Sequence, residues 1–147
     1  MGAYVPSTGR AQSVAISAGW YKDYRDVLVM AVEGQFVWEE AFRAQDETRR
    51  LLSVEGDHPC ALIMDFPQDA LNLPHALSNA RIMMARRHPR LRKIVLVSKS
   101  PFTRTLGNTF TRFLGPADRP FEVCSTLDEA EACLGAAGYL KLKATGD

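Results

Sequence analysis

Hydrophobic and polar residues alternate near the start of the chain. Val14, Ile16 and Trp20 follow a period of two, and residues 27–32 form a second stretch rich in β-forming side chains. The polar segment KDYRD between them, residues 22–26, is typical of a turn. The pattern therefore predicts an antiparallel β-hairpin.

Two later segments are almost wholly apolar. They are CALIMDF, residues 60–66, and KIVLVS, residues 93–98. A strand covered by helices on both faces has this composition, because neither of its sides meets water. We expect residues 60–66 and 94–97 to lie side by side as interior parallel strands, with a last short strand at residues 121–124.

Two helices are predicted in the first part of the chain from apolar residues that recur every three to four positions. One spans about residues 37–54, and the other spans about residues 74–88. Pro74 suits a first helical turn, whereas Pro89 stops the second helix. The residues expected to face the core of the second helix are Leu73, Leu77, Ala80 and Met84.

Two further helices are indicated by capping residues. Ser100 and Pro101 are typical N-cap and N1 residues of a third helix that ends at Gly115. The fourth begins with a capping box, in which Thr126 is followed three residues later by Glu129. The apolar stripe expected on the third helix consists of Phe102, Leu106, Phe110, Phe113 and Leu114.

These elements have the order β-β-α-β-α-β-α-β-α. Strands that alternate with helices indicate an α/β fold with parallel pairing, to which the hairpin adds an antiparallel strand. We expect a mixed, mostly parallel sheet of about five strands with four helices. The length of 147 residues fits one domain over 1–147, with an ordered core of about residues 12–138.

The segments VEGQFVWEEAFRAQ, residues 32–45, ALIMDF, residues 61–66, and LRKIVLVS, residues 91–98, carry a family resemblance. In this order the chain resembles the SpoIIAA-like fold of STAS domains (sulfate transporter and anti-sigma-factor antagonist), and in particular bacterial members. The resemblance implies a non-enzymatic regulatory module that binds a protein partner or itself. The phosphorylatable serine of the anti-sigma antagonists is missing, because DFPQDALNLPHAL, residues 65–77, contains no hydroxyl side chain.

Overall charge argues against a nucleic-acid partner. The chain has 18 Lys and Arg against 17 Asp and Glu, a net charge of +1. Its apolar runs are too short for a membrane span, and the first residues lack the apolar region of a secretory signal. Cys60, Cys124 and Cys133 have no metal-site spacing, so we expect a reduced, cytoplasmic setting.

Asp65 is the first candidate for chemistry, since it ends an apolar strand. Ser98 and Lys99 follow the next strand, and ligands of α/β sheets gather beyond such strand ends. A phosphate-receiving site would also need an acidic pair to hold magnesium, and the early strand supplies only Glu33. The alternative, that Asp65 ends a strand and orders a loop, is favoured.

Other polar residues are expected at the same edge of the sheet. Asn72 and His75 come near the start of the second helix, and Ser100 and Thr103 lie at the start of the third, whose free N–H groups attract anions. The predicted ligand or partner surface comprises Asp65, Asn72, His75, Ser98, Lys99, Ser100 and Thr103.

No catalytic residue, metal site or cofactor is predicted. His58, His75 and His88 lack metal-ligand spacing, and no glycine-rich phosphate loop is present. The basic segment RIMMARRHPRLRK, residues 81–93, would meet phosphate groups or an acidic partner, but a solvated surface is favoured.

Three functions remain open at this stage. The first is a STAS-like interaction module, and the second is a domain that binds a small apolar or anionic ligand or a lipid. The third is an enzyme that uses Asp65, His75 and Lys99. A deep apolar cavity would favour the second, whereas a convergent cleft at Asp65 and Lys99 would favour the third.

Overall fold

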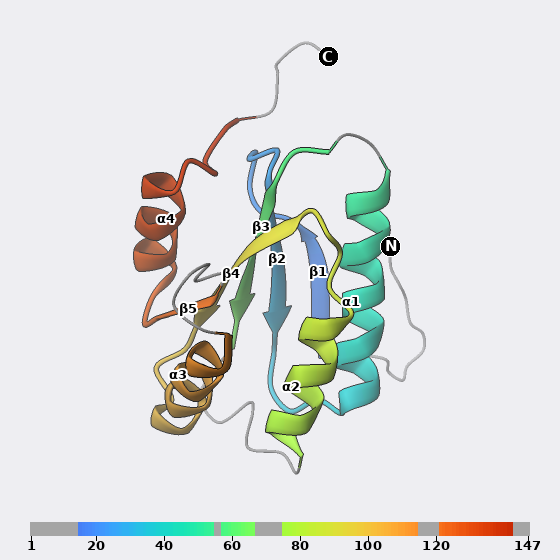
Figure 1. The fold of residues 1–147 in the computed structure, drawn as a ribbon, viewed down its shortest axis with the longest axis vertical. Coiled ribbons are helices and arrows are strands. Elements are labelled where there is room, and N and C mark those ends of the chain that lie inside the picture. The colour runs from blue at the N-terminus through green and yellow to red at the C-terminus, as the bar shows by residue number, and fades with distance from the viewer. Residues whose placement is uncertain (1–14, 55–56, 67–74, 115–120, 143–147) are drawn as a thin grey trace.

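The structure is a computed structural model that describes residues 15–54, 57–66, 75–114 and 121–142. These residues form five strands and four helices (Figure 1). In chain order they are β1 (Ile16–Trp20), β2 (Val27–Val32), α1 (Trp38–Ser53), β3 (Cys60–Asp65), α2 (Ala76–Ala85), β4 (Leu91–Val97), α3 (Pro101–Leu114), β5 (Phe121–Cys124) and α4 (Leu127–Ala136).

The strands form one mixed sheet in the order β1-β2-β3-β4-β5. The β1–β2 pair is an antiparallel hairpin, and each later neighbour is parallel. In the β3–β4 pair, Leu62 lies opposite Ile94 and Ile63 lies opposite Val95. The α/β class, the hairpin and the interior parallel pair formed by the two apolar segments are therefore confirmed.

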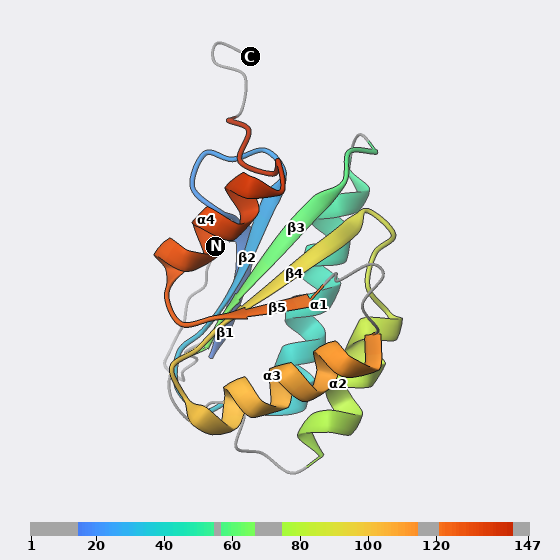
Figure 2. The same cartoon turned by 60° about the vertical axis from the view of Figure 1, so that its left-hand side comes forward.

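The strand order decides where the helices lie. From β2 onward, each crossover moves one strand in the same direction, so crossovers of one hand place their helices on one face of the sheet. Accordingly α1, α2 and α3 cover one face, which we call the three-helix face (Figure 2). Of the described helices, α4 alone covers the opposite face, which we call the one-helix face.

The side chains of β3 alternate between these two faces, as strand geometry requires. Leu62 belongs to the core beneath α1 and α2, together with Leu28 and Ile94. Ile63 points the other way and packs in a smaller core with Leu134 of α4. Because both sides of β3 are covered, its apolar sequence has no alternating pattern.

Most element bounds agree with the sequence prediction to within two residues. Two bounds differ by three residues: β4 begins at Leu91 instead of residue 94, and α2 ends at Ala85 instead of His88. Because Pro89 disfavours helical backbone at the residue before it, the chain leaves the helix early. Val14, Leu73 and Pro74, and the side chains of Leu77, Phe110, Phe113 and Leu114, lie outside the described residues.

Both predicted caps are present. The Ser100 hydroxyl accepts a 3.4 Å hydrogen bond from the Thr103 N–H, and the Thr126 hydroxyl accepts one of 3.1 Å from Glu129. The Glu129 carboxylate accepts from the N–H of Ser125, one residue earlier than an ideal capping box.

The expected stripe of α3 needs one correction, because Phe102 is 48% exposed. The buried face of α3 contains Thr103 and Gly107, one helical turn apart, and Phe102 is rotated about 100° away from Thr103. Within the described ranges every helix is too short or too polar to span a membrane.

Candidate functional site

An apolar cavity of about 80 Å³ lies on the three-helix face, between the sheet and helices α1, α2 and α3. Every strand contributes to its wall, and so do α1, α2 and α3. One lining residue from each strand in turn is Ile16, Met30, Leu62, Leu96 and Phe121.

Small residues on the helices explain why this space is unfilled. Ala41 of α1, Ala76 and Ala80 of α2 and Gly107 of α3 all line the cavity. Opposite them the strands present larger side chains, such as those of Leu62 and Leu96. Protein interiors are normally packed without such voids, so a cavity of this size is a candidate binding site.

Gln45 is the main polar group in the cavity wall. Its side chain is buried, and its amide nitrogen donates a 2.6 Å hydrogen bond to the carbonyl oxygen of Met83. The amide oxygen has no hydrogen-bond partner in the described chain. A buried acceptor without a donor is unfavourable, so this oxygen is a polar point to which a bound molecule or water would donate.

A second hollow, of about 240 Å³, opens beside the end of α2. It is lined by Met84, Ala85, Arg87, His88, Pro89, Leu91 and Arg92. Four of these residues, Met84, Arg87, His88 and Leu91, also line the apolar cavity. The two spaces therefore share a wall that carries basic side chains.

The electrostatic surroundings of His88 favour its neutral form. Its Nδ1 atom accepts a 3.0 Å hydrogen bond from the backbone N–H of Arg90. Burial and the nearby charges of Arg90 and Arg49 lower the pKa of His88. A neutral ring whose Nδ1 is an acceptor carries its proton on Nε2, which is then a donor.

Three of the predicted site residues meet in a different hollow. Asp65, Ser98 and Lys99 line a shallow space of about 340 Å³ at the carboxyl edge of the sheet, together with Ser125 and Thr126. Burial raises the pKa of the Asp65 carboxyl. No ion pair joins Asp65 to Lys99 among residues 15–54, 57–66, 75–114 and 121–142.

The other described residues of the predicted surface do not line this hollow. Ser100 and Thr103 are completely buried at the start of α3, where the Ser98 hydroxyl also accepts from the Ser100 N–H at 3.1 Å. His75 is exposed before α2, with a left-handed φ of 63°. Asn72 lies outside the described residues. The structure thus gathers only part of the expected surface at one place.

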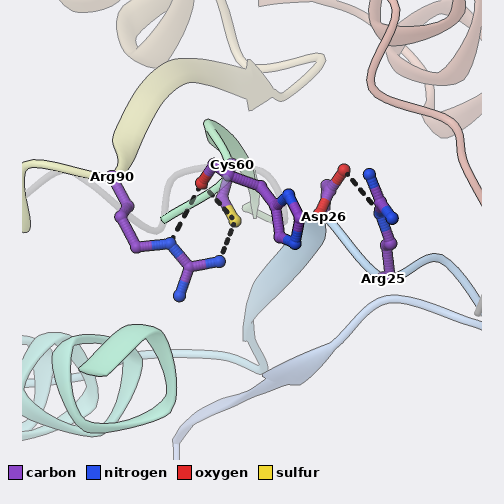
Figure 3. Close-up of polar contacts among 5 residues, drawn as sticks. Arg25, Asp26, Cys60 and Arg90 are labelled. Atoms are coloured by element: carbon purple, nitrogen blue, oxygen red, sulfur yellow. Dashed lines mark hydrogen bonds and ion pairs between the residues drawn. The ribbon is translucent and has the colours of Figure 1, made fainter. Parts of the chain in front are cut away.

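Cys60 lies at the opposite edge of the sheet, in the cluster drawn in Figure 3. Its sulfur accepts a 3.4 Å hydrogen bond from Nη2 of Arg90, and Nε of the same arginine donates to the carbonyl oxygen of His58 at 3.0 Å. Nearby, Asp26 pairs with Arg25 at 3.1 Å. Burial outweighs the charge of Arg90 and raises the pKa of the Cys60 thiol, which makes it a poor nucleophile.

The other two cysteines are also poor nucleophiles, for the same reason as Cys60. Burial likewise raises the pKa of Cys124, and it raises that of Cys133 to about 11 with help from a hydrogen bond to Glu122. In the part of the chain that the structure describes, no three His, Cys, Asp or Glu side chains gather as metal ligands.

Comparison of the chain with protein-family models, curated proteins and solved structures found no match. Sequence reasoning missed the cavity, although one signal was present: alanines and a glycine occupy inward positions of three helices that face large aliphatic residues. It placed Arg87 and His88 in the basic segment 81–93, for which a solvated surface was favoured over contact with phosphate groups or an acidic partner.

Proposed function

We propose that this protein is a non-catalytic binding domain that holds a small apolar molecule between its sheet and helices α1, α2 and α3. The apolar cavity beneath all five strands is the observation that carries this proposal. Engineered apolar cavities of about 150 Å³ stay dry and bind benzene or xenon, so an apolar space is favourable for an apolar guest.

Binding is favoured over catalysis by the state of the reactive side chains. A catalytic thiol needs a lowered pKa, whereas burial raises the pKa of Cys60, Cys124 and Cys133. Asp65 and Lys99 share a hollow without pairing. The cavity wall is mostly apolar, and its polar members are Gln45, Thr48, Arg87 and His88, a composition that suits recognition.

Xenon provides a direct test in solution. We expect xenon to shift the methyl resonances of Met30, Met83 and Met84, which line the cavity. The variant Ala80→Leu adds a side chain to the cavity wall, so the shifts should disappear while the melting temperature stays equal or rises.

A matched variant controls for the added apolar surface. Ala132→Leu places the same side chain on an exposed position of α4, and the xenon shifts should remain as in the unaltered protein. The proposal would be overturned if xenon did not shift the methyl resonances of the unaltered protein. It would also be overturned if the shifts in Ala80→Leu were as large as in the unaltered protein.

A second candidate is a STAS-like interaction module that binds a protein partner or a second copy of itself. The exposed aromatic ring of Phe102 supports it, because this ring follows the exposed Lys99 at the start of α3 and large exposed apolar side chains mark interaction surfaces. The five-stranded mixed sheet with four helices agrees with the family resemblance at the level of fold class.

Sedimentation equilibrium tests the self-association form of this candidate. The unaltered chain should form dimers whose dissociation constant rises at least tenfold in Phe102→Ser. A monomer at all concentrations, or dimers that tolerate Phe102→Ser, would exclude this surface as the self-association site.

A further inference from the structure

We propose that the natural occupant of the cavity is a single-chain amphiphile with an anionic head, such as a carboxylate. Its apolar tail would occupy the cavity, and its head would lie in the hollow lined by Arg87, His88 and Arg92. The inference rests on the proposed function and adds the chemical class of the ligand.

The first argument is that the apolar and basic spaces adjoin. Met84, Arg87, His88 and Leu91 belong to the walls of both. A molecule that leaves the cavity past these residues would enter the hollow beside the end of α2. Its buried part would then meet Met84 and Leu91, while its outer part would meet Arg87 and His88.

The volume of the cavity limits the form of the tail. This volume of about 80 Å³ is roughly half that of the cavities that accept a benzene ring. A space of this size is too small for such a ring, so it suits part of a thinner alkyl chain better.

The second argument is charge. The described lining of the hollow contains Arg87, His88 and Arg92 and no acidic residue. Arg87 uses one N–H to bond the carbonyl oxygen of Met84 at 2.9 Å, and no ion pair involves it or the exposed Arg92 within the described ranges. Arginine presents five N–H donors, so Arg87 keeps donors for an anion.

Neighbouring groups strengthen this positive character. Neutral His88 offers its Nε2–H, and the Arg90 and Arg49 charges that lower its pKa also attract an anion. The last carbonyl oxygens of α2 would repel an anion if they were free. They already accept hydrogen bonds: the backbone N–H of Arg86 donates to the carbonyl oxygens of Ile82 and Met83, and Arg87 donates to that of Met84.

Calorimetry with three ten-carbon probes tests the proposal on the full chain. Decanoate, 1-decanol and decyltrimethylammonium share a tail and differ in head charge. We expect decanoate to bind at least tenfold more tightly than decanol, because hydrogen bonds to a charged group exceed those to a neutral one, and the cation to bind most weakly. Added salt should reduce the difference in affinity between decanoate and decanol, because it screens the charge of the head group.

Charge-removing variants locate the head. Arg87→Gln and Arg92→Gln should each weaken decanoate binding about tenfold and leave decanol binding unchanged. Arg92 is exposed, so its variant should fold normally even if loss of the Arg87–Met84 bond affects folding. Lys99→Gln removes the same charge at the other hollow and should have no effect.

The outcomes separate this inference from the proposed function. Equal binding of decanoate and decanol, or equal loss in Lys99→Gln and Arg92→Gln, overturns the anionic head and leaves the apolar cavity intact. Entry of xenon without binding of any ten-carbon probe overturns the amphiphile. Failure of xenon as well as all three probes overturns the proposed function itself.

Discussion

The two faces of the sheet are built from the same strands but are packed differently. On the three-helix face, α1, α2 and α3 leave an apolar cavity beneath every strand. On the one-helix face, α4 packs Ala130 and Leu134 against Ile63 and Val95, and all four residues are almost inaccessible to solvent. Coverage by more helices therefore does not give a tighter core.

Polar contacts also distinguish the one-helix face. The Tyr21 hydroxyl donates to Glu131 of α4, and Lys22 pairs with the same carboxylate at 2.7 Å. These contacts join α4 to the hairpin, whereas the helices of the other face place small residues such as Ala41 and Gly107 beside large ones such as Met83 in the cavity wall. The comparison suggests that one face provides stability and the other provides binding space.

Side-chain truncation on the two faces should produce the largest effect and test the comparison directly. Leu134→Ala removes a fully buried side chain from the one-helix face and should lower the free energy of unfolding by about 3–5 kcal/mol. Leu62→Ala should cost about 1 kcal/mol less, because Leu62 already borders the cavity and has fewer contacts to lose. Urea denaturation measures both, and an equal or reversed order would refute the difference in packing.

Glycine-to-alanine substitutions should give the next largest effect. A Cβ atom at Gly107 would lie 2.7 Å from Val123 Cγ2 and 2.8 Å from Leu96 Cδ2, so Gly107→Ala should destabilise the protein by about 1–2 kcal/mol. On α4, a Cβ at Gly135 would lie 3.3 Å from Leu140, so Gly135→Ala should be neutral or stabilising by up to about 1 kcal/mol. Thermal unfolding of both variants checks the contrast, and a stabilising Gly107→Ala would show that α3 is not pressed against the sheet.

The hydrogen bond from Tyr21 to Glu131, which joins the hairpin to α4, should contribute about 1 kcal/mol to the free energy of unfolding, the typical value of a hydrogen bond. Burial, followed by the Glu131 hydrogen bond, raises the pKa of Tyr21 from 10.0 to about 12. The contribution is therefore complete below pH 10 and is lost as the pH rises towards 12. The stability difference between the unaltered protein and Tyr21→Phe should shrink over this range. A difference that is constant up to pH 12 would contradict this assignment.

Asp65→Asn should have the smallest effect, within about 0.5 kcal/mol. Burial raises the pKa of Asp65, so its charged form is disfavoured in the folded state, and the amide should be neutral or slightly stabilising at pH 7. Chemical denaturation at pH 4 and pH 7 measures the change. A loss above about 2 kcal/mol would reveal a structural bond to this carboxylate.

Much of the fold could be predicted from the sequence, because local signals are strong in this chain. Ser100 and Thr126 predicted two helix starts, and the apolar composition of residues 60–66 predicted a strand covered on both sides. Phe102 was assigned to the wrong side of α3, since a stripe alone does not fix the rotation of a helix against its neighbour.

The candidate site was predictable only in part. Asp65, Ser98 and Lys99 do share a hollow, because parallel strands end at the same edge of a sheet. Ser100 and Thr103 are buried instead of exposed. The sequence provided no reason to connect Gln45 with the basic segment at residues 81–93, because the distance between α1 and the end of α2 depends on tertiary packing.

The amino-acid sequence by itself determined the elements, their order and their alternating or doubly apolar faces, because these follow from local backbone preference and side-chain period. Only the tertiary structure decided that the strands run in the order β1 to β5, that three helices share one face, and that alanines there leave a cavity. The physical reason is that a cavity depends on the separation between packed elements, and a sequence pattern records which side chains face inward without recording how far apart they lie.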